Sequence, residues 1–253
     1  MTIESPMTAH SGSDADALHD ASARASHGVL DPVGPTSRKE PADAWMLRGF
    51  LDPVSGSQAA FRCALNALAR PGRLHTMPDA ARCEAPAGLS PAMAALLLTL
   101  ADADTSVWLA PVFGEPARRF LRFHNGCPLT EHPEKAAFAV LSATDRTAVA
   151  TWPSLSAFAQ GELANPHGST TLLIDVPFLA DHAEAVVERD AEETATLRGP
   201  GIANAQTLRV AGLPDDFWRE WRANHTRFPL GVDAFLINGA SFCGLPRTTQ
   251  RES

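Results

Sequence analysis

The sequence predicts a layered α/β fold with a mixed sheet, and three observations lead to that prediction. Segments with helical periodicity and segments with strand periodicity alternate along the chain. Residues 170–176 are rich in apolar and β-branched side chains, as is typical of a strand buried on both faces. Two short apolar segments, 234–237 and 241–245, flank Asn238-Gly239, which is a strong local signal for a hairpin. Buried strands and hairpins in one chain indicate that the sheet mixes strand directions.

Helices are predicted where apolar residues recur at helical spacing between start and stop signals. The first begins at Asp52-Pro53 or at the capping box from Ser55 to Gln58, and Arg70-Pro71-Gly72 ends it. The second begins at Ser90-Pro91, ends near Asp102, and is apolar nearly all round, so it is expected to be central. A short helix is expected at 154–160, and another opens at Pro214. The recurring apolar residues are Phe61, Ala64, Leu65 and Leu68 in the first helix and Phe217, Trp218 and Trp221 in the last.

Shorter strands are predicted between these helices. In residues 119–124 we expect Phe120, Arg122 and His124 on one face of a strand, with Leu121 and Phe123 on the other. The remaining strands are predicted at 106–110, 136–141, 194–198 and 207–210.

Composition divides the chain into two parts. Residues 1–44 are dominated by Ala, Ser, Asp, Gly and Pro, have no sustained apolar period, and carry seven acidic against three basic residues. Such a segment buries too little apolar surface to offset its chain entropy, so a disordered acidic extension is predicted. It lacks the basic start and apolar core of a secretory signal. Residues 45–253 are expected to form a single α/β domain.

The charge and the apolar runs argue against several classes of partner. The net charge is −8 and no basic face is evident, so nucleic acid is not an expected partner. The longest apolar run, residues 92–100, is too short to span a bilayer. The four cysteines show no CxxC spacing and are interpreted as reduced thiols in the cytoplasm. No set of residues at ligand spacing predicts a metal site.

Lysine is almost absent. The chain has only Lys39 and Lys135, and neither lies in a predicted core segment. A Schiff base to pyridoxal phosphate therefore has no good candidate, and no cofactor is expected. Arginine carries the positive charge instead, either because its forked guanidinium is needed for anions or because a high-GC genome favours its codons.

The segment after the terminal hairpin holds the first candidate site. Arg247, Thr248 and Thr249 offer a forked cation and two hydroxyls just beyond Pro246, which suits a phosphate. The alternative is a surface salt bridge at a fraying C-terminus. Nearby, Asp233 could be a base or a metal ligand, but turn bonding or capping is the default for such a residue.

The second candidate site is the end of the predicted strand 119–124. Arg122 and His124 could line an anion or substrate pocket there, with His124 as donor or acid–base group. The alternative is an ordinary polar edge. Cys127 follows His124 by three residues, which permits a thiol–imidazole pair, although no third orienting residue is evident.

Several strings in a fixed order resemble the PhnH family, the H subunit of the bacterial carbon–phosphorus lyase machinery for phosphonate use. Each string is weak alone, and the ordered series covers about residues 47–249. The strings are Gly49-Phe50, Asp52-Pro53, Ser57-Gln58, Phe61-Arg62, Arg70-Pro71-Gly72, Leu97-Leu98-Thr99-Leu100-Ala101-Asp102, Thr105, Trp108-Leu109, Leu121-Arg122-Phe123-His124, Thr171-Leu172-Leu173, Gly199-Pro200-Gly201-Ile202, Phe228-Pro229-Leu230-Gly231-Val232-Asp233 and Leu245-Pro246-Arg247-Thr248-Thr249.

The resemblance carries expectations beyond those from composition and spacing. It implies a three-layer α/β/α sandwich like that of pyridoxal-phosphate-dependent transferases, without the cofactor. It implies a homodimer in a core complex with the G, I and J subunits, which supports formation of ribose 1-phosphonate 5-triphosphate from ATP and an alkylphosphonate. The chain would be a structural or ligand-contacting subunit, not catalytic alone. An anion pocket for a nucleotide or phosphonate would use Arg122, His124, Arg247 and Thr248, with sharing across the dimer left open.

Two other interpretations are kept. The chain could be a stand-alone small-molecule hydrolase, using Cys127 and His124, or an anion-binding protein. It could also be a degenerate pyridoxal enzyme.

Overall fold

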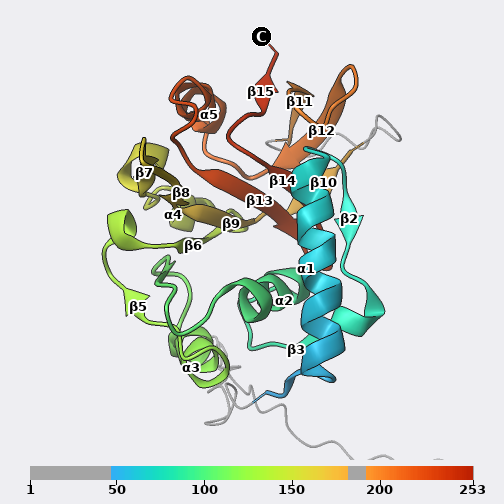
Figure 1. Cartoon of the computed structure of the whole chain (residues 1–253), viewed down its shortest axis with the longest axis vertical. Helices are drawn as coiled ribbons and strands as arrows, with labels where there is room; N and C mark the ends of the chain where they lie inside the picture. The colour runs from blue at the N-terminus through green and yellow to red at the C-terminus, as the bar shows by residue number, and fades with distance from the viewer. Residues whose placement is uncertain (1–46, 182–191, 253) are drawn as a thin grey trace, which may run out of the picture. The chain divides into compact units, whose positions relative to one another are not determined.

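A seven-stranded mixed sheet organises the structure (Figure 1). The structure is a computed structural model that describes residues 47–181 and 192–252. The strands lie in the order β2 (His75–Thr76), β14 (Ser241–Leu245), β13 (Asp233–Asn238), β9 (Thr171–Asp175), β6 (Phe138–Ser142), β4 (Val107–Leu109) and β5 (Leu129–Thr130). The last five of these are parallel to one another, whereas β14 is antiparallel to both of its neighbours. The predicted mixed α/β class is confirmed.

Helices α1 (Pro53–Ala69) and α2 (Pro91–Leu100) pack together beside the sheet, and Figure 1 shows β2 next to α1. Helix α1 begins at Asp52-Pro53, the first of the two predicted starts, because the Asp52 carboxylate accepts the backbone N–H groups of Val54 and Ser55. Its buried face consists of small residues only: Gly56, Ala59, Ala60, Ala64 and Ala67. Small residues let the helix approach β14 closely, and the larger Phe61 and Leu65 point to solvent.

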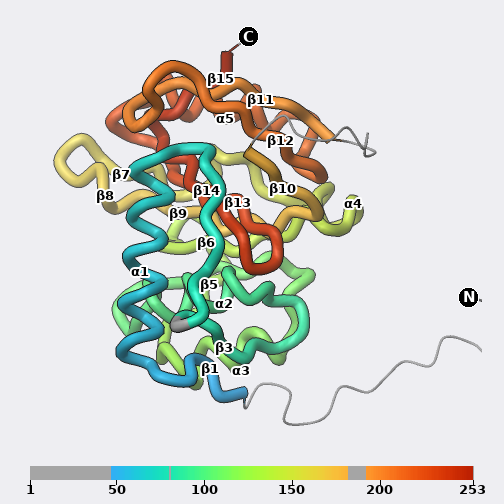
Figure 2. Tube along the Cα trace, turned by 90° about the vertical axis from the view of Figure 1, so that its right-hand side faces the viewer, coloured from blue at the N-terminus to red at the C-terminus, as the bar shows by residue number. Residues whose placement is uncertain are grey.

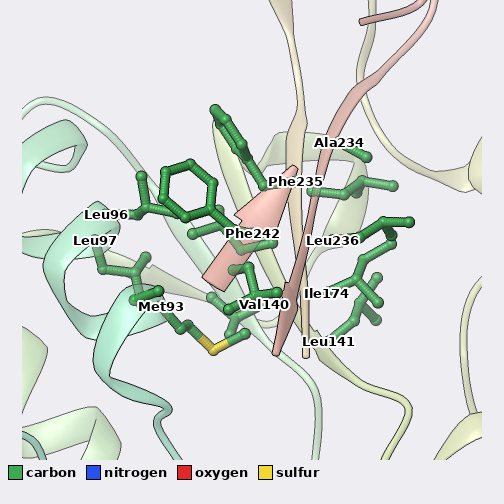
Figure 3. Close-up of a cluster of buried hydrophobic side chains, with 14 of the residues drawn as sticks. Met93, Leu96, Leu97, Val140, Leu141, Ile174, Ala234, Phe235, Leu236 and Phe242 are labelled. Atoms are coloured by element: carbon green, nitrogen blue, oxygen red, sulfur yellow. The ribbon is translucent and has the colours of Figure 1, made fainter. Parts of the chain in front are cut away.

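The core lies between these helices and the sheet. Figure 3 shows side chains from α2 meeting side chains from four adjacent strands, and all of those labelled are almost fully buried. The contributors are Met93, Leu96 and Leu97 from α2, Val140 and Leu141 from β6, Ile174 from β9, Ala234, Phe235 and Leu236 from β13, and Phe242 from β14. The predicted central position of α2 is confirmed, because Ala92 to Leu97 are all buried.

Smaller sheets and helices complete the described part of the chain. An antiparallel sheet has the order β10 (Phe178–Ala180), β12 (Gln206–Ala211), β11 (Glu192–Arg198) and β15 (Gln250–Arg251). Two antiparallel pairs of strands are β1 (Gly49–Phe50) with β3 (Cys83–Glu84) and β7 (Gln160–Glu162) with β8 (Asn165–Ser169). The remaining helices are α3 (Glu115–His124), α4 (Arg146–Val149) and α5 (Phe217–His225), with short 3-10 turns at Asp79–Ala81, Pro133–Lys135 and Leu155–Ala157.

The terminal hairpin is confirmed, with its turn one residue later than the Asn-Gly pair suggests. Asn238 pairs with Ser241, so Gly239 and Ala240 form the turn and Asn238 is the last residue of β13. Gly239 has a φ of 61°, the left-handed conformation that such a turn needs at its first position.

The strand predicted at 119–124 is wrong, because this segment is the second half of helix α3. Pro116 stands in the first turn of the helix, and the buried residues Ala117, Phe120 and Leu121 follow the helical spacing of three and four. In a six-residue window alternate residues and a helical face are hard to tell apart. The short helix expected at 154–160 shrinks to the 3-10 turn Leu155–Ala157, and Gln160 already belongs to β7.

The predicted extension, residues 1–44, lies outside the described residues. All described residues belong to one unit that spans Glu40–Ser253.

Candidate functional site

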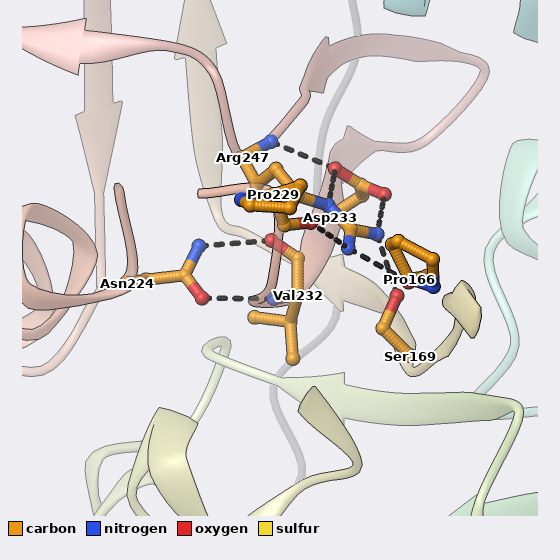
Figure 4. Close-up of polar contacts among 7 residues, drawn as sticks. All are labelled: Pro166, Ser169, Asn224, Pro229, Val232, Asp233 and Arg247. Carbon is orange, nitrogen blue, oxygen red and sulfur yellow. Dashed lines mark hydrogen bonds and ion pairs between the residues drawn. The ribbon is translucent and has the colours of Figure 1, made fainter. Parts of the chain in front are cut away.

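Arg247 lies at the edge of the sheet where the parallel strands begin. Its guanidinium donates from Nε to Asp233 at 3.1 Å, from one terminal nitrogen to the backbone carbonyls of Pro166 and Pro229 at 3.0 and 3.2 Å, and from the other to Asp233 and the Ser169 hydroxyl (Figure 4). A guanidinium has five N–H groups, and each has a protein acceptor here. Only 12% of the Arg247 side chain is exposed. An anion at this position would therefore have to displace an existing contact.

The neighbourhood of Arg247 joins α5, β13 and the segment before β9. The side-chain amide of Asn224, on α5, donates to the Val232 carbonyl and accepts from the Val232 N–H at 2.9 and 2.8 Å (Figure 4). The Arg247 N–H also donates to Asp233 at 2.7 Å. Asp233 thus has the turn-bonding role that its residue type favours. These hydrogen bonds hold α5, β13 and the segment before β9 together, so we call the residues around Arg247 a structural joint.

Thr248 and Thr249 are packed into the same joint. The Thr249 carbonyl accepts the indole N–H of Trp221 at 3.0 Å, and Thr249 is completely buried. A Cβ added at Gly199 would lie 2.8 Å from the Thr248 carbonyl oxygen, so the Gly199 turn approaches this segment closely. The segment after β14 is held from two sides and does not fray.

Arg122 and His124 lie on α3 and point in different directions, because two residues along a helix turn the side chain by about 200°. The Arg122 side of the helix faces solvent, and Arg122 is exposed. The imidazole of His124 packs on Phe120, one turn earlier, and its Nε2 is 2.8 Å from the Leu47 carbonyl oxygen. The expectation that Arg122 and His124 share one face fails for the same reason as the strand prediction.

The structure does not bring the four predicted site residues together within one chain. Helix α3 lies at the end of the domain where β5 is the outermost strand of the sheet, whereas α5 and β15, which flank Arg247 and Thr248, lie at the opposite end (Figure 1 and Figure 2). A joint pocket would need a second chain.

Cys127 is buried and its environment does not activate it. Its thiol lies 3.9 Å from the Leu121 carbonyl oxygen, and burial raises its pKa above the ordinary value of 9.0. Catalytic cysteines show the opposite shift, because the thiolate is the nucleophile. The four cysteines are free thiols, in agreement with the sequence interpretation.

A cleft of about 310 Å³ opens at the other edge of the sheet, where the parallel strands end. Strand β4 continues through α3 to β5 on one side, and β6 continues to β9 on the other side. At such a switch point the two connections leave in opposite directions, and a crevice forms outside the strand ends. Open α/β sheets hold their ligands in this crevice. This edge of the sheet is therefore the best candidate for a ligand site.

The polar groups of the cleft come from three elements. Ser142 and Asp175 are paired neighbours at the ends of β6 and β9. The Ser142 hydroxyl is 2.8 Å from the hydroxyl of Thr144, and Ser90, at the start of α2, also lines the cleft. Burial raises the pKa of the Asp175 carboxyl, and the nearby Ser90 hydroxyl, which is buried without a hydrogen-bond partner among the described residues, partly offsets this effect. The sequence interpretation missed all four residues as site residues.

A signal for this cleft was available in the sequence. Ser142 directly follows the strand predicted at 136–141, and Asp175 lies near the end of the buried strand predicted at 170–176, where a polar residue needs an explanation. Carboxyl ends of parallel strands meet at one edge, so the two residues could have been expected to lie together.

A larger cavity of about 670 Å³ lies between α4 and α5. Two of its three acidic residues are already engaged: Glu220 accepts the Leu155 N–H at 2.6 Å, and Asp216 pairs with Arg219 at 2.8 Å. Asp215 is the exposed carboxylate of its rim.

Neither a metal cluster nor a membrane span is found in residues 47–181 and 192–252. No three His, Cys, Asp or Glu side chains of these residues are grouped to hold a metal ion. No helix in the described part of the chain has the length and apolar character to cross a bilayer.

Comparisons with known proteins show to which family the chain belongs. The family model for the bacterial phosphonate metabolism protein PhnH matches residues 48–252. The α-D-ribose 1-methylphosphonate 5-triphosphate synthase subunit PhnH of Rhizobium meliloti (strain 1021) is 35% identical over 204 residues, which cover 80% of this chain and 94% of the relative. The putative C–P lyase subunit protein HtxG of Stutzerimonas stutzeri is 29% identical over 194 residues, 76% of this chain and 84% of the relative. The chain therefore belongs to the PhnH family of bacterial phosphonate metabolism proteins.

Proposed function

We propose that this chain is a subunit of the carbon–phosphorus lyase machinery, where it supports formation of ribose 1-phosphonate 5-triphosphate from ATP and an alkylphosphonate. One observation carries the proposal: the similarity to the Rhizobium meliloti synthase subunit extends over 94% of that relative. The similarity to a putative C–P lyase subunit supports the same pathway.

The chain is proposed to act as an accessory subunit in the cytoplasm, not as an enzyme alone. The local chemistry of the sequence candidates favours this role. The Cys127 thiol has a raised pKa, and the donors of Arg247 are engaged within the chain. A stand-alone hydrolase built on Cys127 and His124 is thus the weaker alternative. The scaffold is proposed to resemble that of pyridoxal-phosphate-dependent transferases, and the chain is proposed not to use the cofactor.

The proposed partners are the G, I and J subunits and a second copy of the chain. Tagged chain purified from phosphate-starved cells should carry G, I and J with it. The isolated chain should not turn over ATP plus methylphosphonate, whereas the assembled complex should. Purification without these subunits, or turnover by the isolated chain, would contradict the accessory role.

The outer face of α1 is the surface proposed for the second copy. Its large apolar side chains are exposed: Val54 by 67%, Phe61 by 47% and Leu65 by 51%. The helical positions 54, 61 and 65 lie on one side of the helix. Large apolar side chains usually lie on the buried face of a helix, but in α1 the buried face is made of small residues and the large apolar side chains are exposed. Such an exposed apolar stripe is typical of an interaction surface.

An antiparallel pair of α1 helices that crosses at Phe61 would be self-complementary. The same apolar side chains of both copies would meet at the crossing point, and the two helix dipoles would oppose each other.

The dimer is tested by light scattering on Phe61→Glu. This change should convert the dimer to a monomer, because it places two carboxylates at the crossing point. The matched control is Leu163→Glu in the β7–β8 turn, where Leu163 is 78% exposed. A dimer that survives Phe61→Glu, or a wild-type monomer, would refute the α1 interface without bearing on the C–P lyase role.

A further inference from the structure

We infer that the cleft at the ends of β4, β6 and β9 binds the hydroxyl groups of a neutral five-membered sugar ring, the ribose of a riboside or ribonucleotide. The choice of ribose among neutral sugars rests on the proposed function, in which ATP is the substrate, whereas the place of the site follows from the groups that line the cleft.

The polar lining suits hydroxyl groups. A carboxylate can accept hydrogen bonds from two neighbouring hydroxyls of a sugar, and serine and threonine hydroxyls can donate to or accept from a third. Asp175 and Ser142 lie side by side on adjacent strands, with Thr144 bonded to Ser142 and Ser90 facing from α2. These groups converge from three separate elements on one opening.

The charge of the cleft argues against an anionic group. No lysine, arginine or histidine is among the residues that line it. The carboxyl of Asp175 would repel a phosphonate or a triphosphate at close range. A charged end of a ribonucleotide would therefore have to lie outside the cleft, with the sugar inside.

The apolar lining and the size also suit a sugar ring. Leu89, Val112 and Phe113 supply the apolar part of the wall, which can cover the carbon face of a furanose. A volume of about 310 Å³ is at the small end of the range for ligand pockets, about 300–1,000 Å³. It holds a pentose more readily than an entire nucleotide.

Binding is measured by saturation-transfer NMR and calorimetry on the full chain with methyl β-D-ribofuranoside, ATP, dATP and methylphosphonate. We expect the riboside and ATP to bind and methylphosphonate not to bind through Asp175. The comparison of ATP with dATP tests the two neighbouring ribose hydroxyls. Because dATP lacks one of them, it loses one hydrogen bond to a charged group, and its affinity should be about tenfold lower than that of ATP.

Variants in the cleft and on the rim of the larger cavity test which of the two sites binds the riboside. Asp175→Ala should weaken riboside binding by about tenfold or more, and Ser142→Ala should weaken it severalfold. Asp215→Asn, on the rim of the larger cavity, is the matched control and should leave affinity unchanged. Circular dichroism of each variant confirms folding, and Asp175→Asn is a second variant in which the buried charge is removed with little change of shape.

Three outcomes would overturn the inference. They are the absence of riboside binding at concentrations up to tens of millimolar, equal affinity for ATP and dATP, and loss of affinity in Asp215→Asn but not in the Asp175 variants. Each is independent of whether the chain co-purifies with other subunits, so the proposed function can stand when the inference fails.

Discussion

Arg247 and Asp233 are joined by three hydrogen bonds, one from the Arg247 backbone N–H and two from its guanidinium. The pair ties the segment after β14 back to the first residue of β13. Only 12% of the arginine and 23% of the aspartate side chain is exposed. The sequence suggests that Arg247 binds an external anion, but in the structure its anionic partner is the Asp233 carboxylate of the same chain.

We expect Arg247→Ala to lower the free energy of unfolding by about 3 kcal/mol, since removing one partner leaves Asp233 charged and poorly solvated. Urea denaturation monitored by fluorescence measures the change. The control is Arg122→Ala on α3, where the exposed arginine should be worth less than about 0.5 kcal/mol. Equal midpoints for the two variants would show that the joint around Arg247 adds little to stability.

Gly244→Ala should destabilise the domain by a purely steric route. A Cβ at Gly244 would lie 2.7 Å from the backbone carbonyl carbon and oxygen of Ala67, so β14 and α1 would have to separate. Overpacking of this kind costs about 1–3 kcal/mol.

Gly239→Ala is the matched control for Gly244→Ala. No atom lies within 4 Å of a Cβ placed at Gly239, so only the left-handed φ of 61° opposes the change, at a cost of about 1 kcal/mol. Thermal melts of both variants compare the two costs. A larger loss in Gly239→Ala would contradict the close approach of α1 to β14.

The sequence was sufficient for most elements, because their signals are local and agree with one another. Asp52-Pro53 starts α1, Ser90-Pro91 starts α2, and the hairpin at Gly239 forms between the two strands predicted. Helix α3 was missed because Phe120 and His124 fit both a strand face and a helix face in a short window.

The site was harder to predict, because strand direction decides which polar residues meet. Arg247 follows the second strand of a hairpin, so the chain has returned to the edge where β13 and β9 begin. Asp175 ends a parallel strand and lies at the edge where the cleft forms. Periodicity gives the strands without their order or direction, so the sequence could not separate the two edges.

The stability of the chain should respond to pH through Asp175. Burial raises the pKa of this carboxyl above the ordinary 3.8, so the folded chain keeps a proton that the unfolded chain has already lost. The folded state therefore loses stability as the pH rises from about 3.8 through the raised pKa, and the full cost is present above that value.

Asp175→Asn removes this cost, so the variant should be more stable than the wild type at pH 7 and lose its advantage as the pH falls towards 4. The control, Asp145→Asn, should behave in the opposite way. Hydrogen bonds from the backbone and side chain of Thr147 lower the pKa of Asp145, so its carboxylate stabilises the fold above the ordinary pKa. Urea midpoints between pH 4 and pH 8 give both differences. An Asp175→Asn variant that is less stable than the wild type at pH 7 would mean that the carboxylate is stabilised in the cleft.

The thiols should be slow to alkylate in the folded chain. Burial raises the pKa of Cys83 to about 11, two units above the ordinary 9.0, which leaves about 100-fold less thiolate at pH 8. Burial also raises the pKa values of Cys63, Cys127 and Cys243. Iodoacetamide labelling followed by peptide mass spectrometry, in buffer and in urea, should show a slower reaction in buffer at every cysteine, by at least about tenfold at Cys83. Rapid labelling of Cys127 in the folded chain would instead indicate a thiolate, and it would restore the hydrolase in which His124 activates this residue.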